Sequence, residues 1–170
     1  MIPTYVTREE TDELERLGAS KRVLELGAQF GYSTIHLARS AAEVWSVDWH
    51  FGDDQAGEMD TLSAWAGHTA NLRKAGRVVG IIGRFEMVLP LLQPASFDLI
   101  FHDGYHGRAE VMRDARLALP LLSWRGIFCA HDWGSFSGVQ GLATVMGSPD
   151  YVMGSLAVWL NPGGRWGPGE

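Results

Sequence analysis

Apolar and polar positions along the chain fall into short blocks with two different periods. Apolar-rich runs of five or six residues predict buried strands at 22–26, 43–48, 77–82, 97–101 and 126–130. Between these runs, apolar residues recur at helical spacing and predict helices at 7–18, 31–40, 61–75 and 108–119. Buried strands that alternate with helices form a parallel sheet covered on both faces, so the pattern predicts a doubly wound, Rossmann-like α/β fold. A last run at 155–160 predicts a late antiparallel strand at an edge of this mostly parallel sheet.

The first predicted helix carries clear end signals. Thr7 and Glu10 have the spacing of a capping box, in which each side chain accepts a hydrogen bond from the backbone amide of the other. Leu14 and Leu17 follow at helical spacing, and Gly18 can close the helix. We expect this helix to cover a face or an edge of the sheet.

Composition and charge limit the architecture and the partners. With 170 residues and 46% hydrophobic content, the chain suits one domain over 1–160, followed by an irregular, glycine- and proline-rich tail at 161–170. The net charge of −6 argues against a nucleic-acid surface and favours a small-molecule partner. Cys129 is the single cysteine, which excludes an intrachain disulfide.

The chain also lacks the usual signals for membranes and export. Its apolar runs fall well short of the roughly 18 residues that a membrane span needs. Residues 1–10 lack the basic and apolar regions of a signal peptide. We therefore expect no membrane association and a cytoplasmic location.

Polar residues gather where the predicted strands end. In open α/β sheets, ligands bind beyond the carboxyl ends of the strands. Because parallel strands bring these ends to one rim, we expect one site there. The candidates at the strand ends are Glu25 with Gly27, Asp48 with Trp49, residues 83–86, residues 103–106, and His131 with Asp132.

The turn after the first strand discriminates between cofactors. A dinucleotide-binding turn needs glycine at the third and sixth positions counted from Gly27, where this chain has Gln29 and Tyr32. A nicotinamide-dependent dehydrogenase is therefore disfavoured. An acid before the turn and glycines at Gly27 and Gly31 better suit a cofactor with a cationic end and no phosphate. S-adenosylmethionine meets that description, and Asp48 has the position of an acid that binds ribose hydroxyls.

Several stretches, in order, resemble class I S-adenosylmethionine-dependent methyltransferases, specifically the catechol O-methyltransferase-like branch that acts on small molecules. VLELGAQFGYST resembles the first family motif, VWSVDW the ribose-binding strand and IIGRFEMVLPLL the adenine-binding strand and helix. FDLIFHDGYH and GIFCAHDW resemble the two catalytic motifs, so the likeness runs from about Val23 to Trp133. It implies a fold of about seven strands with a late antiparallel edge strand. The cofactor-binding residues that it implies are Glu25, Gly27, Gln29, Phe30, Gly31, Ser33, Asp48, Trp49, Phe85, Glu86 and Asp103.

The resemblance also implies a catalytic arrangement. In catechol-type relatives, acids at two neighbouring strand ends hold a magnesium ion, and a base three positions after the first acid accepts a proton. Asp103 and Asp132 match the acids, and His106 matches the base. Trp133 stands in the place of a third ligand, for which His131 can compensate. In the alternative without metal, Asp103 binds the cofactor or caps a loop, and Asp132 orients His106.

These features predict an S-adenosylmethionine-dependent O-methyltransferase of a small molecule, with Mg²⁺ as a second candidate cofactor. The alternative from another class is a catalytically reduced S-adenosylmethionine-binding or scaffolding protein, because the chain has little room for a substrate-recognition insertion. The apolar strand at 155–160 also suits a homodimer contact. We interpret residues 50–54 as a solvated loop, with a flap over the site as the alternative.

Overall fold

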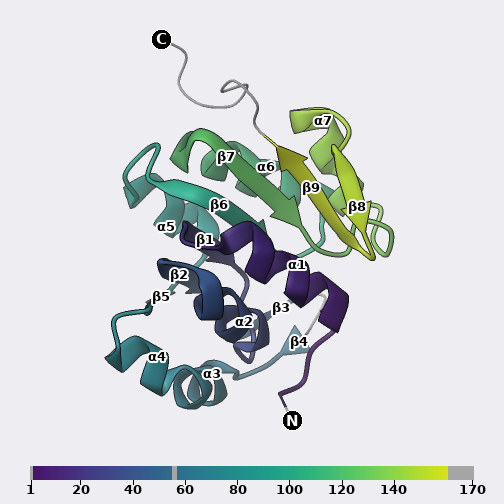
Figure 1. Ribbon diagram of the computed structural model, residues 1–170. Helices are drawn as coiled ribbons and strands as arrows, with labels where there is room; N and C mark the ends of the chain where they lie inside the picture. Colours follow the sequence, from purple (N-terminus) through teal and green to yellow (C-terminus); the bar gives the residue numbers. More distant parts are fainter. Residues whose placement is uncertain (1, 55–56, 161–170) are drawn as a thin grey trace.

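The computed structural model describes residues 2–54 and 57–160, which surround a seven-stranded sheet (Figure 1). The strands lie in the order β5-β2-β1-β6-β7-β9-β8, and β9 alone among them runs against the others. The order turns back between β1 and β6, where ligands bind in folds of this kind. The predicted doubly wound, mostly parallel sheet is therefore confirmed. Its strands are β1 (Arg22–Leu26), β2 (Glu43–Asp48), β5 (Val78–Ile82), β6 (Phe97–His102), β7 (Leu122–Ala130), β8 (Tyr151–Met153) and β9 (Leu156–Leu160).

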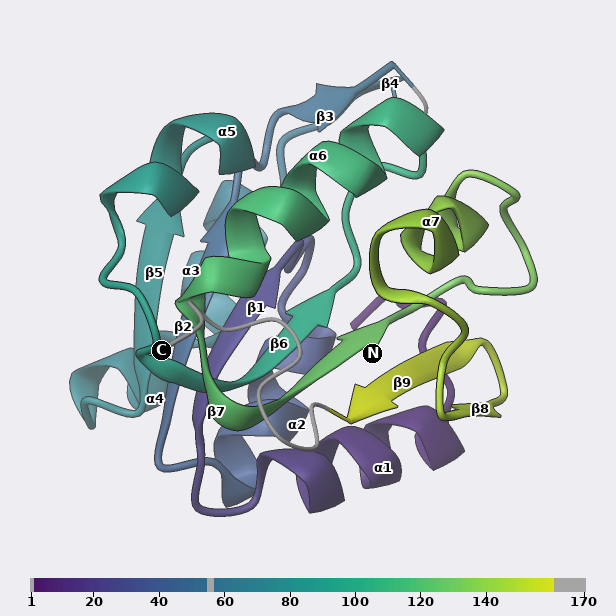
Figure 2. The same cartoon turned by 90° about the horizontal axis from the view of Figure 1, so that it is seen from above.

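Helices cover both faces of the sheet, as Figure 2 shows from above. One face carries α1 (Arg8–Gly18), α2 (Tyr32–Ser40) and α3 (Leu62–His68), which bury Leu14, Leu37 and Trp65 against the strands. The other face carries α5 (Phe85–Val88), α6 (Arg108–Ala118) and α7 (Leu142–Met146), with Val111 and Leu142 in its core. No helix in the described part of the chain is long and apolar enough to cross a membrane. The remaining helical segments are α4 (Ala70–Lys74), η1 (Leu89–Leu91), η2 (Leu119–Leu121) and η3 (Val139–Gly141).

Alternation along β1 decides which side chains face which layer. Successive residues of a strand point to opposite faces. Val23 belongs to the core beneath α1 and α2, whereas Leu24 and Leu26 belong to the core beneath α5 and α6. Glu25 therefore points toward α2 and not along the strand toward the rim.

The predicted capping box at the start of α1 is confirmed. The Thr7 hydroxyl accepts a hydrogen bond from the Glu10 amide at 3.3 Å, and the Glu10 carboxylate accepts one from the Thr7 amide at 2.8 Å. Both bonds satisfy amides that the first turn of a helix leaves without partners. Glu10 is thereby held at the N-terminal end of α1.

Two sequence predictions are wrong in detail. The single helix predicted at 61–75 is two short helices, α3 and α4, joined at Thr69. The Thr69 hydroxyl donates to the Trp65 carbonyl at 2.8 Å, and such back-bonding bends helices. The strand predicted from 126 begins at Leu122, because the expected turn is an irregularity inside β7 where Arg125 has a φ of 64°.

Three further segments complete the comparison with the predicted elements. The predicted late strand is present as antiparallel β9, and the unpredicted strand β8 pairs with its outer edge. The polar stretch after β2 contains a small hairpin of β3 (Gly52–Asp53) and β4 (Gly57–Glu58). The predicted tail at 161–170 lies outside the described residues, and the 1–160 domain boundary stays a prediction.

Candidate functional site at the strand ends

Two glycines in left-handed backbone conformations shape the turn between β1 and α2. Gly27 has a φ of 94° and Gly31 a φ of 89°. A Cβ atom on Gly27 would overlap the carbonyl oxygen of Asp103, so the turn passes directly against the loop after β6. A Cβ atom on Gly31 would lie 3.0 Å from the Trp65 ring. Glycine is therefore required at both positions by conformation and by space.

Asp48, at the end of β2, fixes this turn from the neighbouring strand. One carboxylate oxygen accepts hydrogen bonds of 2.7 Å from the amides of both Ala28 and Gln29. The other accepts from the amide of His50 at 2.6 Å. Gln29 has a left-handed φ of 45°, which these bonds help to hold. The predicted ribose acceptor thus also organises the glycine turn.

Glu25 lies beneath the turn, and its predicted place around the methionine end of the cofactor stays a prediction. Its side chain is fully buried, and its carboxylate accepts hydrogen bonds of 2.6 Å from Ser33 and Thr34 and of 2.7 Å from Ser46. Burial raises the pKa of Glu25 to about 7, although the three hydroxyls act to lower it. Because β1 turns this side chain toward α2, Glu25 supports the turn from below.

A cavity of about 940 Å³ opens at the carboxyl ends of the parallel strands. Glu25 and Gly31 are absent from its described lining, the first because it is buried under the turn and the second because it faces Trp65. Strand ends that are far apart in the sequence therefore meet in one space, as predicted. The predicted site residues in the lining are Gly27, Gln29, Phe30, Ser33, Asp48, Trp49, Phe85, Glu86, Asp103, His106, His131 and Asp132.

Other lining residues were not predicted from the sequence. The segment 3–6 reaches the cavity, although it precedes the first helix and carries no recognisable motif. Ser135 and Phe136 line the cavity beyond the end of β7. The β3–β4 hairpin contributes Gly52 and Asp53, which belong to the segment 50–54 for which a flap over the site was the alternative prediction. The motif GIFCAHDW ends just before Ser135 and Phe136, so only their closeness to a catalytic motif pointed to them.

The predicted adenine end contains two charged contacts. The Arg84 guanidinium lies 5.2 Å from the ring centroid of Trp49, within cation–π range. A carboxylate oxygen of Glu86 lies 3.3 Å from the Arg113 guanidinium. Trp49 is 39% exposed, so one end of the cavity offers an accessible flat surface.

His106 and Asp132 form a pair in the segments that follow β6 and β7. The Nε2 atom of His106 lies 3.1 Å from a carboxylate oxygen of Asp132, and the imidazole stacks on Phe136 with 4.3 Å between ring centroids. Asp132 has a left-handed φ of 62°, which turns it off the end of β7. Burial alone would raise the pKa of Asp132, but His106 and His131 outweigh it and hold the pKa well below its usual range.

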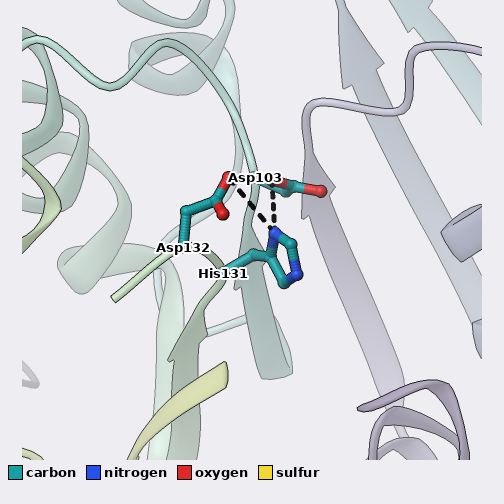
Figure 3. Close-up of side chains that lie close together, drawn as sticks. All are labelled: Asp103, His131 and Asp132. Carbon is teal, nitrogen blue, oxygen red and sulfur yellow. Dashed lines mark ion pairs between the residues drawn. The ribbon is translucent and has the colours of Figure 1, made fainter. Parts of the chain in front are cut away.

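His131 is enclosed by carboxylates, as Figure 3 shows for Asp103 and Asp132. Its Nδ1 atom lies 3.4 Å from an oxygen of each, and its Nε2 atom lies 3.2 Å from Glu10. Burial alone would lower the pKa of His131, but Asp103 and Asp132 raise it to about 11. The ring is therefore a buried cation at neutral pH.

The predicted magnesium ligands do not fit a metal in this arrangement. Asp103, His131 and Asp132 each place one donor atom within 4.8 Å of the others, so their spacing alone would suit an ion. However, Nδ1 of His131 lies 3.4 Å from an oxygen of each carboxylate as part of an ion pair, and the protonated ring of an imidazolium cannot ligate a metal. Trp133, at the place of the third ligand, packs against Trp159 with 5.4 Å between ring centroids. The two acids already share one cation, the His131 imidazolium.

Comparison with known proteins gives one family match and many structural neighbours. A family model described as a methyltransferase domain matches residues 24–133. Cofactor-bound Rv0187 from MTB has a TM-score of 0.72 at 19% identity, covering 94% of this chain and 83% of its own. The O-methyltransferase TomG from Streptomyces achromogenes, solved with SAM, has a TM-score of 0.62 at 23% identity, covering 82% of this chain and 66% of its own. An O-methyltransferase from Bacillus cereus, solved with SAH, has a TM-score of 0.64 at 20% identity, covering 84% of this chain and 70% of its own. Among curated proteins, no sequence matches.

Proposed function

The chain belongs to the methyltransferase domain family, and we therefore propose that it is an S-adenosylmethionine-dependent O-methyltransferase of a small molecule. The matched residues include the glycine turn, Asp48, and the pair of His106 and Asp132. TomG and the Bacillus cereus protein are described as O-methyltransferases with SAM or SAH bound, which supports the same cofactor and acceptor atom here.

The glycine turn is the proposed binding site for the methionine end of the cofactor. Gly27, Gln29 and Phe30 line the cavity where the methionine end would lie, with Ser33 beside the start of α2. Asp48 can accept a hydrogen bond from one ribose hydroxyl while keeping its amide bonds, because the carboxylate oxygen that accepts from His50 has a second lone pair. The adenine end of the proposed site is bordered by Trp49, Phe85 and Glu86.

The proposed reaction is an in-line displacement at the methyl carbon. The acceptor oxygen forms a bond to this carbon while the carbon–sulfur bond breaks, and its electron pair stays on sulfur. The acceptor proton moves to His106, whose imidazolium Asp132 stabilises at 3.1 Å. The products are the methyl ether, S-adenosylhomocysteine and one proton. The protein's main contribution is to align the two reactants.

The magnesium ion implied by the family resemblance has no step in this scheme. Its two proposed ligands, Asp103 and Asp132, both face the imidazolium of His131. The backbone carbonyl of Asp103 lies against Gly27 of the turn, and Asp103 lines the same cavity, so its negative charge can complement the cationic end of the cofactor. We therefore assign Asp103 to cofactor binding and Asp132 to the orientation of His106.

One observation carries the proposal. His106, the proposed general base, and its partner Asp132 line the same cavity as the glycine turn and Asp48. A catalytically reduced S-adenosylmethionine-binding protein would need the turn but not this pair. Because the proposed general base and the glycine turn line one cavity, the structure favours an enzyme over a protein that only binds the cofactor.

Calorimetric titration with S-adenosylmethionine and S-adenosylhomocysteine tests the cofactor assignment, with NAD as the comparison ligand. We expect both sulfur ligands to bind and NAD not to bind. Asp48→Ala should weaken binding at least tenfold, because it removes the proposed ribose acceptor and releases the turn. Asp12→Ala on the exposed side of α1 is the matched control and should bind like the wild type. Absence of S-adenosylmethionine binding in the wild type would contradict the proposal.

Transfer of a labelled methyl group to a catechol probe tests the enzymatic part. His106→Ala should reduce turnover by about 10²-fold or more while cofactor affinity is retained, because the proton acceptor is lost. His36→Ala in α2, whose imidazole pairs with Glu15, is the control histidine and should keep turnover. Equal turnover in His106→Ala and wild type would remove His106 from the mechanism.

A further inference from the structure

Glu10 forms more contacts than its capping role requires. It is 1% exposed, and one carboxylate oxygen accepts hydrogen bonds from the Ser155 amide at 2.6 Å and the Ser155 hydroxyl at 2.9 Å. The other oxygen accepts from the Thr7 amide at 2.8 Å and faces Nε2 of His131 at 3.2 Å. Glu10 thus joins the start of α1, the β8–β9 turn and the catalytic rim.

The contacts of His131 determine which of its atoms donate. Nε2 faces Glu10, and Nδ1 faces Asp103 and Asp132 at 3.4 Å each. An ionised carboxylate only accepts hydrogen bonds, so Nε2 donates to Glu10, and a proton on Nδ1 completes the ion pairs with Asp103 and Asp132. The amides of Thr7 and Ser155 and the Ser155 hydroxyl all donate to Glu10, and such donors favour its ionised form. Carboxylates on both sides of the ring therefore favour an imidazolium.

We propose that Glu10 is a positioning residue that holds His131 as a doubly donating cation between Asp103 and Asp132, and that this fixed cation replaces a divalent metal. The effect on methyl transfer rests on the proposed function. The replacement of the metal does not, because it concerns binding at the rim alone.

The surroundings of the ring oppose its displacement by an ion. His131 is 3% exposed, and its amide donates to the His102 carbonyl at 3.0 Å, which continues the pairing of β6 and β7. Glu10 is confined in turn, since a Cβ atom on Gly154 would lie 2.6 Å from its carboxylate. A metal between Asp103 and Asp132 would have to expel a cation that three carboxylates hold from two sides.

Binding of Mn²⁺, followed by electron paramagnetic resonance on the full-length protein, tests the replacement directly. We expect no stoichiometric binding to the wild type at millimolar Mn²⁺, and unchanged methyl transfer after chelation with EDTA. One Mn²⁺ bound per wild-type chain, and lost in Asp132→Asn, would overturn the proposal. If the wild type shows no methyl transfer at all, the proposed function fails, whereas the Mn²⁺ measurement still decides on the metal.

The kinetics of Glu10→Gln test the positioning role. An amide cannot keep all four donors satisfied, so we expect kcat to fall about tenfold while KM for S-adenosylmethionine changes less than about twofold. Glu10→Asp keeps the charge and should recover part of the loss. Glu13→Gln is the matched control, because Glu13 is a buried glutamate of the same helix that binds Arg16 and Tyr151. Circular dichroism confirms folding of each variant, and equal kcat for Glu10→Gln and Glu13→Gln would overturn the positioning role.

Discussion

Glu10 and Glu25 are both buried, but their surroundings drive their charge in opposite directions. Glu10 lies behind His131 at the end of β7, and burial alone would raise its pKa. The amides of Thr7 and Ser155 outweigh burial and lower this pKa to about 2. Glu25 lies beneath the glycine turn, where burial raises the pKa to about 7 despite three hydroxyl donors.

The kind of donor explains the difference. Among the described residues, the hydrogen-bond donors to Glu25 are the neutral hydroxyls of Ser33, Thr34 and Ser46, and the charge of Asp48 further raises the pKa. Glu10 faces two backbone amides, a hydroxyl and a cationic ring. Burial therefore does not by itself decide whether a carboxylate is charged. Fixed amide dipoles and a neighbouring cation can replace the lost water, whereas hydroxyls do so only in part.

The largest effect expected from this comparison belongs to Glu10→Ala. The change leaves the His131 cation without its partner on one side and removes the acceptor of the Thr7 and Ser155 amides. Loss of one member of a buried ion pair typically costs about 3–5 kcal/mol of the free energy of unfolding. Urea denaturation at pH 7 measures this cost. Glu9→Ala, on the exposed side of the same turn, should change stability by less than about 0.5 kcal/mol. A similar small loss for both variants would mean that Glu10 and His131 are not coupled.

Glu25→Gln should change the pH dependence of stability. A carboxyl group whose pKa is about 7 when folded and 4.5 when unfolded binds its proton more tightly in the folded state. The wild type therefore loses stability as pH rises from about 4.5 to about 7, by roughly 3 kcal/mol from this group. The variant lacks this titration, so its stability relative to the wild type should increase over that range. Urea denaturation at pH 5 and pH 8 measures both curves, and parallel curves would contradict the raised pKa.

The fold was predictable because each parallel strand can be recognised from its own short stretch of sequence. Each parallel strand is an apolar-rich run bounded by turns, and all five predicted runs are present in the sheet. The strand β8 was not predictable in this way, because Tyr151–Met153 is only three residues long and two of them are exposed. The break at Thr69 depends on a hydrogen bond of its own side chain, which helical periodicity does not report.

The site was predictable as a set of strand ends but not as a network. Motifs placed Asp48, His106 and Asp132 at one rim, where the structure brings them into one cavity. The burial of Glu25 beneath the turn follows from strand alternation, which places it on the same face as Val23, whereas the motif alone does not indicate this burial. The link between Glu10 and His131 joins residues 121 positions apart, so only the tertiary fold reveals it.

Ser46→Ala removes one neutral donor from Glu25, and its effect should depend on pH. At pH 8 the lost bond is to a charged group, so we expect a cost of about 2 kcal/mol in the free energy of unfolding. At pH 5 Glu25 is protonated in the folded state, and the cost should fall to about 1 kcal/mol. Denaturation of wild type and variant at both pH values gives the difference. An equal cost at both would show that Glu25 keeps one protonation state between them.

Ser155→Ala is the corresponding change at Glu10 and should have the smallest effect. The variant loses the hydroxyl bond of 2.9 Å, but the Ser155 amide and the Thr7 amide still donate, so we expect a cost of about 1 kcal/mol. Because the pKa of Glu10 is about 2, this carboxylate is ionised throughout pH 5–8, and the cost should be the same across that range. The same denaturation series measures it beside Ser46→Ala. A cost that rises with pH as it does for Ser46→Ala would mean that Glu10 also titrates near neutrality, and the two glutamates would then differ in place but not in charge.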